Sequence, residues 1–165
     1  FTSLEIWLTK LEQHLESATA ADTAKQIADH GVAIAAAAYQ GGLLREPGER
    51  HSAHFDHFKR RLDLCQRFAI PKMILAADFP PGVSRLSLGW GLKSLAEAAR
   101  WAAGFGVQLA LEFHGSADFC NCLDTAVSLI CLSIVPKRSF RNADKAVLRA
   151  ASTSPVPRRT SSAVT

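Results

Sequence analysis

The sequence predicts an α/β protein with a parallel sheet built from four strand–helix units. Strand-like and helix-like segments alternate from the first residues to about residue 131, and the turns between them are short and contain Gly or Pro. A strand followed by a helical crossover favours parallel pairing with right-handed connections. At 165 residues and 48% hydrophobic content, the chain is long enough for one sizeable core.

The first two strands are predicted near the amino terminus. Ser3–Leu8 alternates apolar and polar residues, as a half-buried strand does. Thr19–Asp22 is a capping-box variant that opens a helix, and Gly31 suits the position just after the end of that helix. Val32–Ala38 follows as a buried strand of small residues, and the Gly- and Pro-containing segment 39–48 is predicted as a loop.

The second half of the predicted fold repeats this order. A helix is expected over Arg50–Phe68, a strand over Lys72–Ala77, a helix over Leu86–Gly104, a strand over Val107–Phe113 and a helix over Phe119–Ile130. The first of these helices has an apolar stripe at three- and four-residue spacing. The stripe consists of Phe55, Phe58, Leu62 and Cys65.

Charge and composition change after residue 131. The segment 132–165 has seven Lys or Arg residues and one Asp, a charge of +6, whereas residues 1–131 carry −2. This segment is also rich in Ser and Pro, so we expect a disordered basic tail after one domain at 1–131. The tail has no recognisable nucleic-acid-binding motif and only one aromatic residue, Phe140, which makes nucleic acid an unfavoured partner.

The last predicted strand contains the most informative polar residue. Side chains of a strand alternate, so Glu112 and His114 would face away from the helices together with Gln108 and Ala110. A carboxylate in an apolar interior is costly unless a cation or hydrogen bonds compensate it. A divalent metal at Glu112 is one solution, and hydrogen bonds from a neighbouring loop are the other.

Further polar and aromatic residues lie at the ends of the other strands, where ligands bind in parallel α/β proteins. Aromatic rings and hydrogen-bonding groups together suit a polyol, although ordinary loop contacts are the favoured explanation for any one of these residues. Glu5, beside Trp7, is expected to be a buried structural carboxylate. The candidate substrate-binding residues are Trp7, Lys10, Gln40, Asp78 and His114.

Two other groups of metal-ligating residue types give weaker signals. His51, His54 and His57 follow at three-residue steps, which spread them over a helix face instead of around one ion. Cys120 and Cys122 lack a second paired motif, so the cysteines are expected to be reduced thiols.

Several segments, in this order, resemble the xylose-isomerase-like sugar isomerase/epimerase family. Val107–Asn121 contains the pattern LALEF followed by an Asn-bearing segment, and Leu4–Trp7 resembles the second strand of the family. Asp29–Ala33 resembles the start of the third strand, and Arg61–Ala76 resembles a helix and the fourth strand. The resemblance covers about residues 1–130, and LALEF is its most specific part.

The resemblance implies a partial (β/α)8 TIM barrel that contains strands two to five. It implies a metal-dependent aldose–ketose isomerase or epimerase acting on a sugar or sugar phosphate, with Mn²⁺, Mg²⁺, Co²⁺ or Zn²⁺ as cofactor. Glu112 matches the first metal ligand and would also act as the acid/base. A complete barrel needs about 250 residues, so we expect an incomplete metal site, weak or no activity, and a truncated or frame-altered product.

Three alternatives stay open at this stage. A non-catalytic α/β fragment would self-associate through its open sheet edges. An inosose dehydratase or an abasic-site endonuclease would use the same barrel, although the charge of residues 1–131 disfavours a DNA enzyme. The chain has no apolar run long enough for a membrane span and no signal-peptide pattern, so we expect a cytoplasmic protein.

Overall fold

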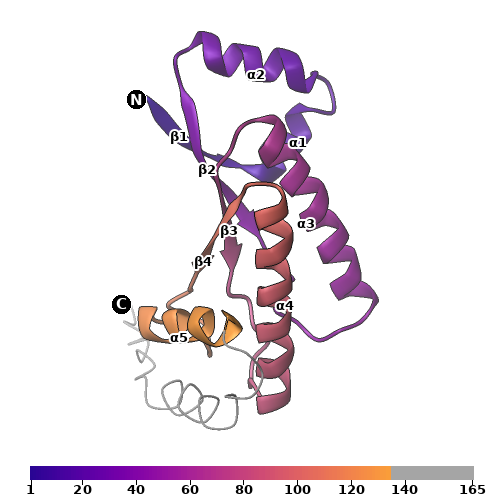
Figure 1. Ribbon diagram of the computed structural model, residues 1–165, viewed down its shortest axis with the longest axis vertical. Helices are drawn as coiled ribbons and strands as arrows, with labels where there is room; N and C mark the ends of the chain where they lie inside the picture. The colour runs from indigo at the N-terminus through magenta and orange to yellow at the C-terminus, as the bar shows by residue number, and fades with distance from the viewer. Residues whose placement is uncertain (135–165) are drawn as a thin grey trace, which may run out of the picture.

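The computed structural model describes residues 1–134. Strands and helices alternate along this part of the chain (Figure 1). The elements are β1 (Ser3–Trp7), α1 (Leu8–His14), α2 (Ala20–Asp29), β2 (Ala33–Gln40), α3 (Glu49–Arg67), β3 (Lys72–Ala76), α4 (Arg85–Gly104), β4 (Gln108–Glu112) and α5 (Leu123–Ile134).

The four strands form one sheet in the order β1-β2-β3-β4, and every neighbouring pair is parallel. Each strand therefore lies beside the next one along the chain, as in a barrel that is wound in one direction. The predicted fold class is confirmed: the described residues form four consecutive strand–helix units of a partial TIM barrel. β1 and β4 are the edge strands of this sheet.

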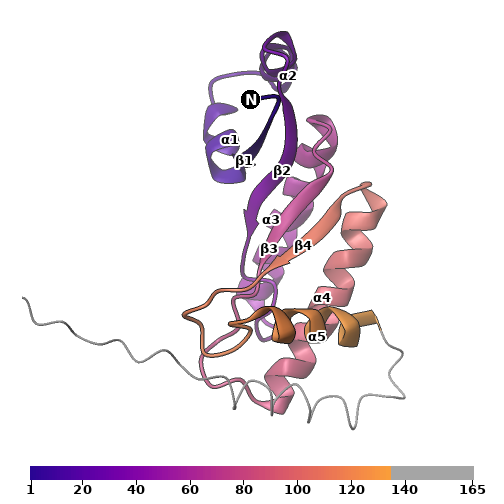
Figure 2. The same cartoon turned by 90° about the vertical axis from the view of Figure 1, so that its left-hand side faces the viewer.

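The hydrophobic core lies between the sheet and the helices on one of its faces. α3 and α4 run side by side along this face (Figures 1 and 2). All four residues of the predicted apolar stripe on α3 are buried. Fully buried side chains from β3 and α4 complete the layer, among them Met73, Leu75, Leu88 and Leu92.

The opposite face of the sheet carries exposed side chains. Trp7 on β1 is 64% exposed and Tyr39 on β2 is 58% exposed. On β4, Leu109 and Leu111 pack against the core, whereas Gln108, Ala110 and Glu112, which alternate with them, are exposed. The alternation predicted for this strand is therefore present, with Glu112 on the helix-free face.

Local sequence signals explain where several helices begin and end. The Thr19 hydroxyl accepts the N–H of Asp22 at 3.1 Å, as a helix cap does. Gly31 follows α2 with φ of +64°, a backbone conformation that favours glycine. Ser84 and Ser87 form a reciprocal capping box at the start of α4.

The first strand is shorter than predicted, because a helix starts at Leu8. Leu8 continues the alternation of the strand, but it is also three residues from Leu11. Both side chains are buried as part of α1, with exposed fractions of 0% and 3%. The prediction of a strand through Leu8 was wrong here, since one apolar residue satisfies both periods and burial selected the helical one.

Burial differs from expectation for three further residues. Glu5 and Glu112 are both exposed, so neither needs the compensation that a buried carboxylate requires. The reason is that no layer of residues 1–134 covers the helix-free face. Phe113 lies just beyond the end of β4 and is 39% exposed, more than an apolar residue that continues the buried face of the strand would be.

The predicted start of the tail, at residue 132, falls within α5. The rest of the predicted tail lies outside the described residues. Within residues 1–134, no helix combines the length and the apolar character that a membrane crossing demands.

Candidate functional site

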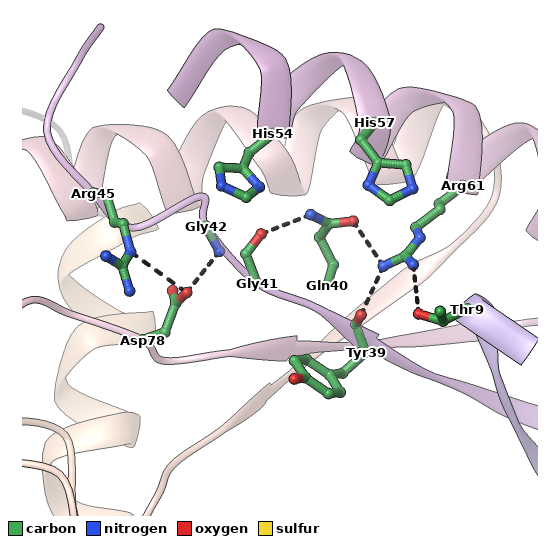
Figure 3. A pocket seen from close by; sticks show the side chains of 10 residues that line it. All are labelled: Thr9, Tyr39, Gln40, Gly41, Gly42, Arg45, His54, His57, Arg61 and Asp78. Atoms are coloured by element: carbon green, nitrogen blue, oxygen red, sulfur yellow. Dashed lines mark hydrogen bonds and ion pairs between the residues drawn. The ribbon is translucent and has the colours of Figure 1, made fainter. Parts of the chain in front are cut away.

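The carboxyl ends of β1, β2 and β3 surround a polar cavity of about 340 Å³ (Figure 3). The segment after β2 lines one side of this cavity and α3 lines another. Asp78, which follows β3, also lines it. Ligands of parallel α/β proteins bind at this edge of the sheet. The lining residues are Thr9, Tyr39, Gln40, Gly41, Gly42, Arg45, His54, His57, Arg61 and Asp78.

Asp78 is the acidic residue that lines this cavity. Its Oδ2 accepts the backbone N–H of Gly42 at 2.7 Å and lies 3.7 Å from Nε of Arg45. Its Oδ1 is buried and has no hydrogen-bond partner within residues 1–134. Burial raises the pKa of the Asp78 carboxyl, against the opposing effects of the Gly42 N–H and the Arg45 charge.

Gly42 is required by two features of this wall. Its φ is +82°, which side-chain-bearing residues rarely adopt. A Cβ at this position would also overlap the imidazole ring of His54. The absence of a side chain therefore lets α3 approach the segment after β2, with His54 against the backbone that holds Asp78.

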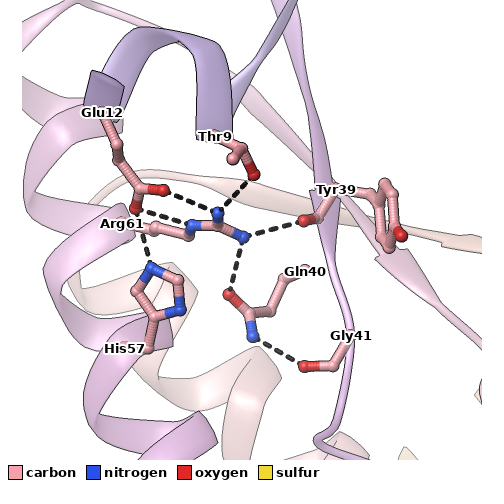
Figure 4. Close-up of polar contacts among 7 residues, drawn as sticks. All are labelled: Thr9, Glu12, Tyr39, Gln40, Gly41, His57 and Arg61. Carbon is pink, nitrogen blue, oxygen red and sulfur yellow. Dashed lines mark hydrogen bonds and ion pairs between the residues drawn. The ribbon is translucent and has the colours of Figure 1, made fainter. Parts of the chain in front are cut away.

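A second polar network borders the cavity and is centred on Arg61 of α3 (Figure 4). Nε and an Nη of Arg61 donate to the two carboxylate oxygens of Glu12 at 2.8 and 2.7 Å. Further donors of the same guanidinium reach the Tyr39 carbonyl at 2.9 Å and the Thr9 hydroxyl at 3.1 Å. This network joins α1, β2 and α3, and it explains how a guanidinium can be only 7% exposed.

The network also holds His57 and Gln40. His57 Nε2 donates to Glu12 at 2.8 Å, and Gln40 donates its amide to the Gly41 carbonyl at 2.7 Å. Arg61 lowers the pKa of the Glu12 carboxyl, and His57 adds to this effect against the opposing influence of burial. Every group of the network thus has its partner in the chain itself.

The three histidines of α3 serve separate contacts. His51 hydrogen-bonds to the Leu43 carbonyl at 3.2 Å and to Ser94 Oγ at 3.0 Å. His57 binds Glu12, and His54 lies against Gly42. A second cavity of about 320 Å³ adjoins the first and shares Gly42, Arg45 and His54 with it.

The predicted substrate-binding residues are divided between several places. The structure brings Gln40 and Asp78 together in the cavity, whereas Trp7 is exposed on the helix-free face. Lys10 is exposed on α1 and donates to Gln13 at 3.3 Å. His114 is exposed beyond β4, where its Nδ1 lies 2.9 Å from Ser116 Oγ.

The predicted metal ligand Glu112 does not belong to a complete metal site within residues 1–134. Within residues 1–134, no group of three or more His, Cys, Asp or Glu side chains is arranged to hold a metal ion. The four cysteines form no disulfide among the described residues, and burial raises the pKa of both Cys65 and Cys120 to about 11. The residues of this part of the chain therefore do not fit a complete metal centre.

Sequence reasoning missed the residues that shape this edge most strongly. Glu12 and Arg61 are 49 residues apart, and no local pattern links them. Arg45 and Gly42 lie in a segment that was predicted only as a loop. The Gly41–Gly42 pair was the available signal, because paired glycines often mark a close approach of the backbone to another group.

The fold and this site together define a parallel α/β protein of the barrel type, with its polar cavity at the carboxyl edge of the strands. A family model described as Xylose isomerase-like TIM barrel matches residues 1–131. The chain belongs to this family. Among curated proteins, no significant match to the chain is found.

Solved structures share the fold at low sequence identity. A xylose isomerase domain protein from Alicyclobacillus acidocaldarius has a TM-score of 0.65 and 14% identity, over 82% of this chain and 51% of its own. The IOLI protein with a bound zinc atom has a TM-score of 0.62 and 20% identity, over 70% of this chain and 42% of its own. An L-ribulose 3-epimerase has a TM-score of 0.58 and 16% identity, over 81% of this chain and 47% of its own. The chain thus spans about half the length of these proteins.

Proposed function

We propose that the chain is a sugar isomerase/epimerase-type protein that binds a sugar or sugar phosphate at the carboxyl edge of its sheet. One observation carries the proposal: a polar cavity opens at the ends of β1, β2 and β3, and Glu112 ends the neighbouring strand β4. Family membership and the shared fold of an L-ribulose 3-epimerase support the class of reaction.

In this proposal, Asp78 contacts the sugar from the cavity, and the buried Gln40 shapes the cavity wall. Lys10 and His114 lie outside the cavity lining and would contact a ligand that extends beyond it. Trp7 offers an aromatic surface to the apolar C–H face of the sugar. Glu112 exchanges a proton with a hydroxyl-bearing carbon, for which its exposed position on the helix-free face leaves room.

Glu112 is also the proposed ligand of a divalent ion, which would polarise the sugar oxygens when bound. An ion held by fewer than three protein ligands is bound weakly, and the described residues contain no group of three or more His, Cys, Asp or Glu side chains that could hold one. We therefore expect weak binding by this chain and low or absent turnover.

A titration with Mn²⁺ tests the role of Glu112. We expect weak binding to the wild-type chain and at least about fivefold weaker binding to Glu112→Gln, because the substitution removes the charge of the ligand. Glu5→Gln is the matched control, since Glu5 is an exposed carboxylate on β1, away from the carboxyl end of β4. Equal affinities of wild type and Glu112→Gln would show that the ligand assignment is wrong.

A second candidate function is self-association of two copies through their open sheet edges. β1 and β4 each pair on one side only within residues 1–134, and Leu4 on β1 is 41% exposed. Unpaired strand edges with apolar side chains favour pairing with another chain. Light scattering of the full chain decides this point: a dimer is expected, and a monomer at high concentration contradicts it.

Two further activities of this barrel type receive less support. A DNA enzyme acting at abasic sites would use its histidines together on metal ions, whereas here they make separate contacts. An inosose dehydratase is compatible with the same cavity. Parallel assays of sugar isomerisation and of dehydration separate it from an isomerase.

A further inference from the structure

The two edge strands of the sheet match each other in length and direction. β1 (Ser3–Trp7) and β4 (Gln108–Glu112) have five residues each, and all strands of the sheet are parallel. Within residues 1–134, each of them pairs on one side only and presents unpaired backbone groups along its outer side. Two strands lie between them, which separates β1 from β4 by about 14 Å at a strand spacing of about 4.8 Å. The two edges therefore do not pair with each other inside one copy.

A second copy can pair with both edges at once. When it is rotated by 180° about an axis that runs roughly along the strands, its β1 lies beside β4 of the first copy and its β4 lies beside β1. Both new pairs are parallel, like every pair within the sheet. The two sheets then form a ring of eight strands, the number at which parallel strands joined by helices close into a barrel. A closed ring leaves no strand edge exposed, and its symmetry stops the assembly at two copies.

The helix α5 has an apolar stripe that residues 1–134 leave exposed. Its buried side, which includes Ala126 and Leu129, packs where α5 contacts α4 and β4. On the other side, four apolar residues follow at steps of four, three and four, the spacing of a helix that packs against another element. A helix that is apolar on both sides is typical of a buried helix. The exposed stripe consists of Leu123 (63% exposed), Val127 (48%), Ile130 (43%) and Ile134 (75%).

The opposite end of the sheet offers a matching apolar position. Leu4 of β1 lies opposite Ile34 in the strand register, and Ile34 belongs to the core on the helix side of the sheet. Leu4 is nevertheless 41% exposed, because it lies on an edge strand. α5 lies at the β4 end of the molecule and packs on α4, which covers the helix side (Figure 1). In the ring of two copies, α5 of one copy is therefore the helix next to Leu4 of the other.

The same arrangement brings together predicted site residues that one copy keeps apart. Trp7 and Lys10 lie at the carboxyl end of β1, whereas Glu112 and His114 lie at the carboxyl end of β4. At about 14 Å, the two ends are too far apart to contact one small ligand. In the ring they belong to neighbouring strands, about 4.8 Å apart. Lys10 and Glu112 are both exposed and have opposite charges, so the two ends are also complementary in charge.

We propose that two copies of the chain close an eight-stranded parallel barrel, in which β4 of each copy pairs with β1 of the other. α5 of each copy covers Leu4 of the other copy. The carboxyl edge of each junction combines Glu112 of one copy with Trp7 and Lys10 of the other. The proposal rests on the second candidate function, self-association through sheet edges, and assigns it a defined pair of edges, a fixed number of copies and a shared site.

The helix-free faces of the two copies form the interior of this ring. Glu5 lies on this face, and so does Lys72, which alternates with the buried Met73 on β3. The interior thus contains charges of both signs, which lowers the cost of enclosing the Glu5 carboxylate. Trp7 and Tyr39, exposed in one copy, supply apolar surface that packs there. An eight-stranded barrel has an interior that side chains of this kind fill.

Cross-linking of two cysteine variants tests which edges pair. The exposed Cys131 and the half-buried Cys122 are first replaced by serine, which leaves only the buried Cys65 and Cys120. Ser3→Cys on β1 or Ala110→Cys on β4 is then added. A short bismaleimide reagent is applied to each variant by itself and to a mixture refolded together from urea. We expect a cross-linked dimer from the mixture only, because the ring places β1 of one copy beside β4 of the other.

The opposite results overturn the ring in distinguishable ways. Cross-linking of either variant by itself would show that like edges pair, so self-association would stand and this geometry would fail. A mixture without cross-linked dimer would show that the two edges do not meet. Light scattering at increasing concentration adds a further check, because a closed ring stops at two copies. Growth to larger assemblies would show an open chain of edges.

A matched pair of leucine variants tests the contribution of α5. Leu123 and Leu86 are both 63% exposed and lie in the first turn of a helix, but only Leu123 belongs to the stripe. We expect Leu123→Asp to raise the dissociation constant of the dimer at least about tenfold, because the burial of this side chain is lost at both junctions. Leu86→Asp should leave the constant unchanged.

Circular dichroism checks that both leucine variants fold. A dissociation constant of Leu123→Asp equal to that of the wild type would overturn the ring, which requires this contact. If Leu123→Asp unfolds, the cross-linking of the mixture decides. The Mn²⁺ titration of Glu112→Gln is read separately, so a wrong metal ligand and a wrong association geometry are told apart.

Discussion

Two carboxylates border the same cavity and have opposite surroundings. Glu12 accepts two hydrogen bonds from Arg61 and one from His57, and these contacts lower the pKa of its carboxyl. Asp78 accepts the backbone N–H of Gly42, its Oδ1 has no hydrogen-bond partner within residues 1–134, and burial raises the pKa of its carboxyl. The side chains are equally accessible, at 28% exposed each.

The comparison shows that burial alone does not decide what a carboxylate does. The whole side chains are equally exposed, but the carboxyl group of Asp78 is more deeply enclosed, so burial is the main influence on its pKa. For Glu12 the main influence is the hydrogen bond from Arg61 of α3, which also joins α1 to the rest of the fold. Stability measurements on variants of the two carboxylates can therefore separate these two situations.

The largest effect is expected from Arg61→Met. The substitution keeps the unbranched stem but leaves Glu12 and the Tyr39 carbonyl without their donor, at a cost of about 3 kcal/mol in the free energy of unfolding. Arg67→Met is the control, because its ion pair with Asp63 is exposed and should contribute less than about 1 kcal/mol. Urea denaturation measures both, and equal losses would show that the Arg61 network is not structural.

An intermediate effect on the free energy of unfolding is expected from Glu12→Gln, and this effect depends on pH. The lowered pKa of Glu12 contributes stability above the ordinary glutamate pKa of about 4.3. This stability is lost as pH falls through the folded-state pKa, so Glu12→Gln should destabilise more at pH 7 than at pH 3. Arg61 and His57 are the charged groups that face it.

The contribution of Asp78 to the free energy of unfolding should change with pH in the opposite direction. Its raised pKa means that stability decreases as pH rises from the ordinary aspartate value of about 3.9 through the folded-state pKa. Asp78→Asn should therefore be neutral or stabilise by up to about 1 kcal/mol at pH 7, and gain nothing at pH 3. Arg45 and His54 face this carboxyl and limit the gain. A strong destabilisation at pH 7 would show that Asp78, like Glu12, is structural.

The smallest effect on stability is expected from Glu112→Gln. Glu112 is exposed on the helix-free face, so its replacement should change the free energy of unfolding by less than about 0.5 kcal/mol. Thermal unfolding of the two proteins measures the difference. A loss above about 1 kcal/mol would indicate that Glu112 has a structural partner.

Much of the fold could be predicted from local patterns. The capping box at Thr19 and the glycine at position 31 mark the limits of α2, and the apolar stripe of α3 identifies its buried face. Strand–helix alternation then implies a parallel sheet. The helix α1 was missed, because Leu8 fits a strand and a helix equally well and only its burial with Leu11 distinguishes them.

The candidate site was predictable only in part. Parallel strands end at one edge, so residues after strands, such as Gln40 and Asp78, could be placed near each other. Which of them has free hydrogen-bonding capacity could not be predicted. Gln40 is occupied by Arg61, a residue 21 positions away, whereas Asp78 is held by the backbone of Gly42, 36 positions away.

The sequence by itself determined the order of the strands and of every helix except α1, and the face of β4 on which Glu112 lies. These properties depend on the periods of side chains along a single element, which are local. Only the tertiary structure decided that Arg61 closes a network with Glu12 and that Asp78 keeps one oxygen unpaired. Such pairings depend on distances between elements, and a linear pattern contains no information about which donors reach which acceptors.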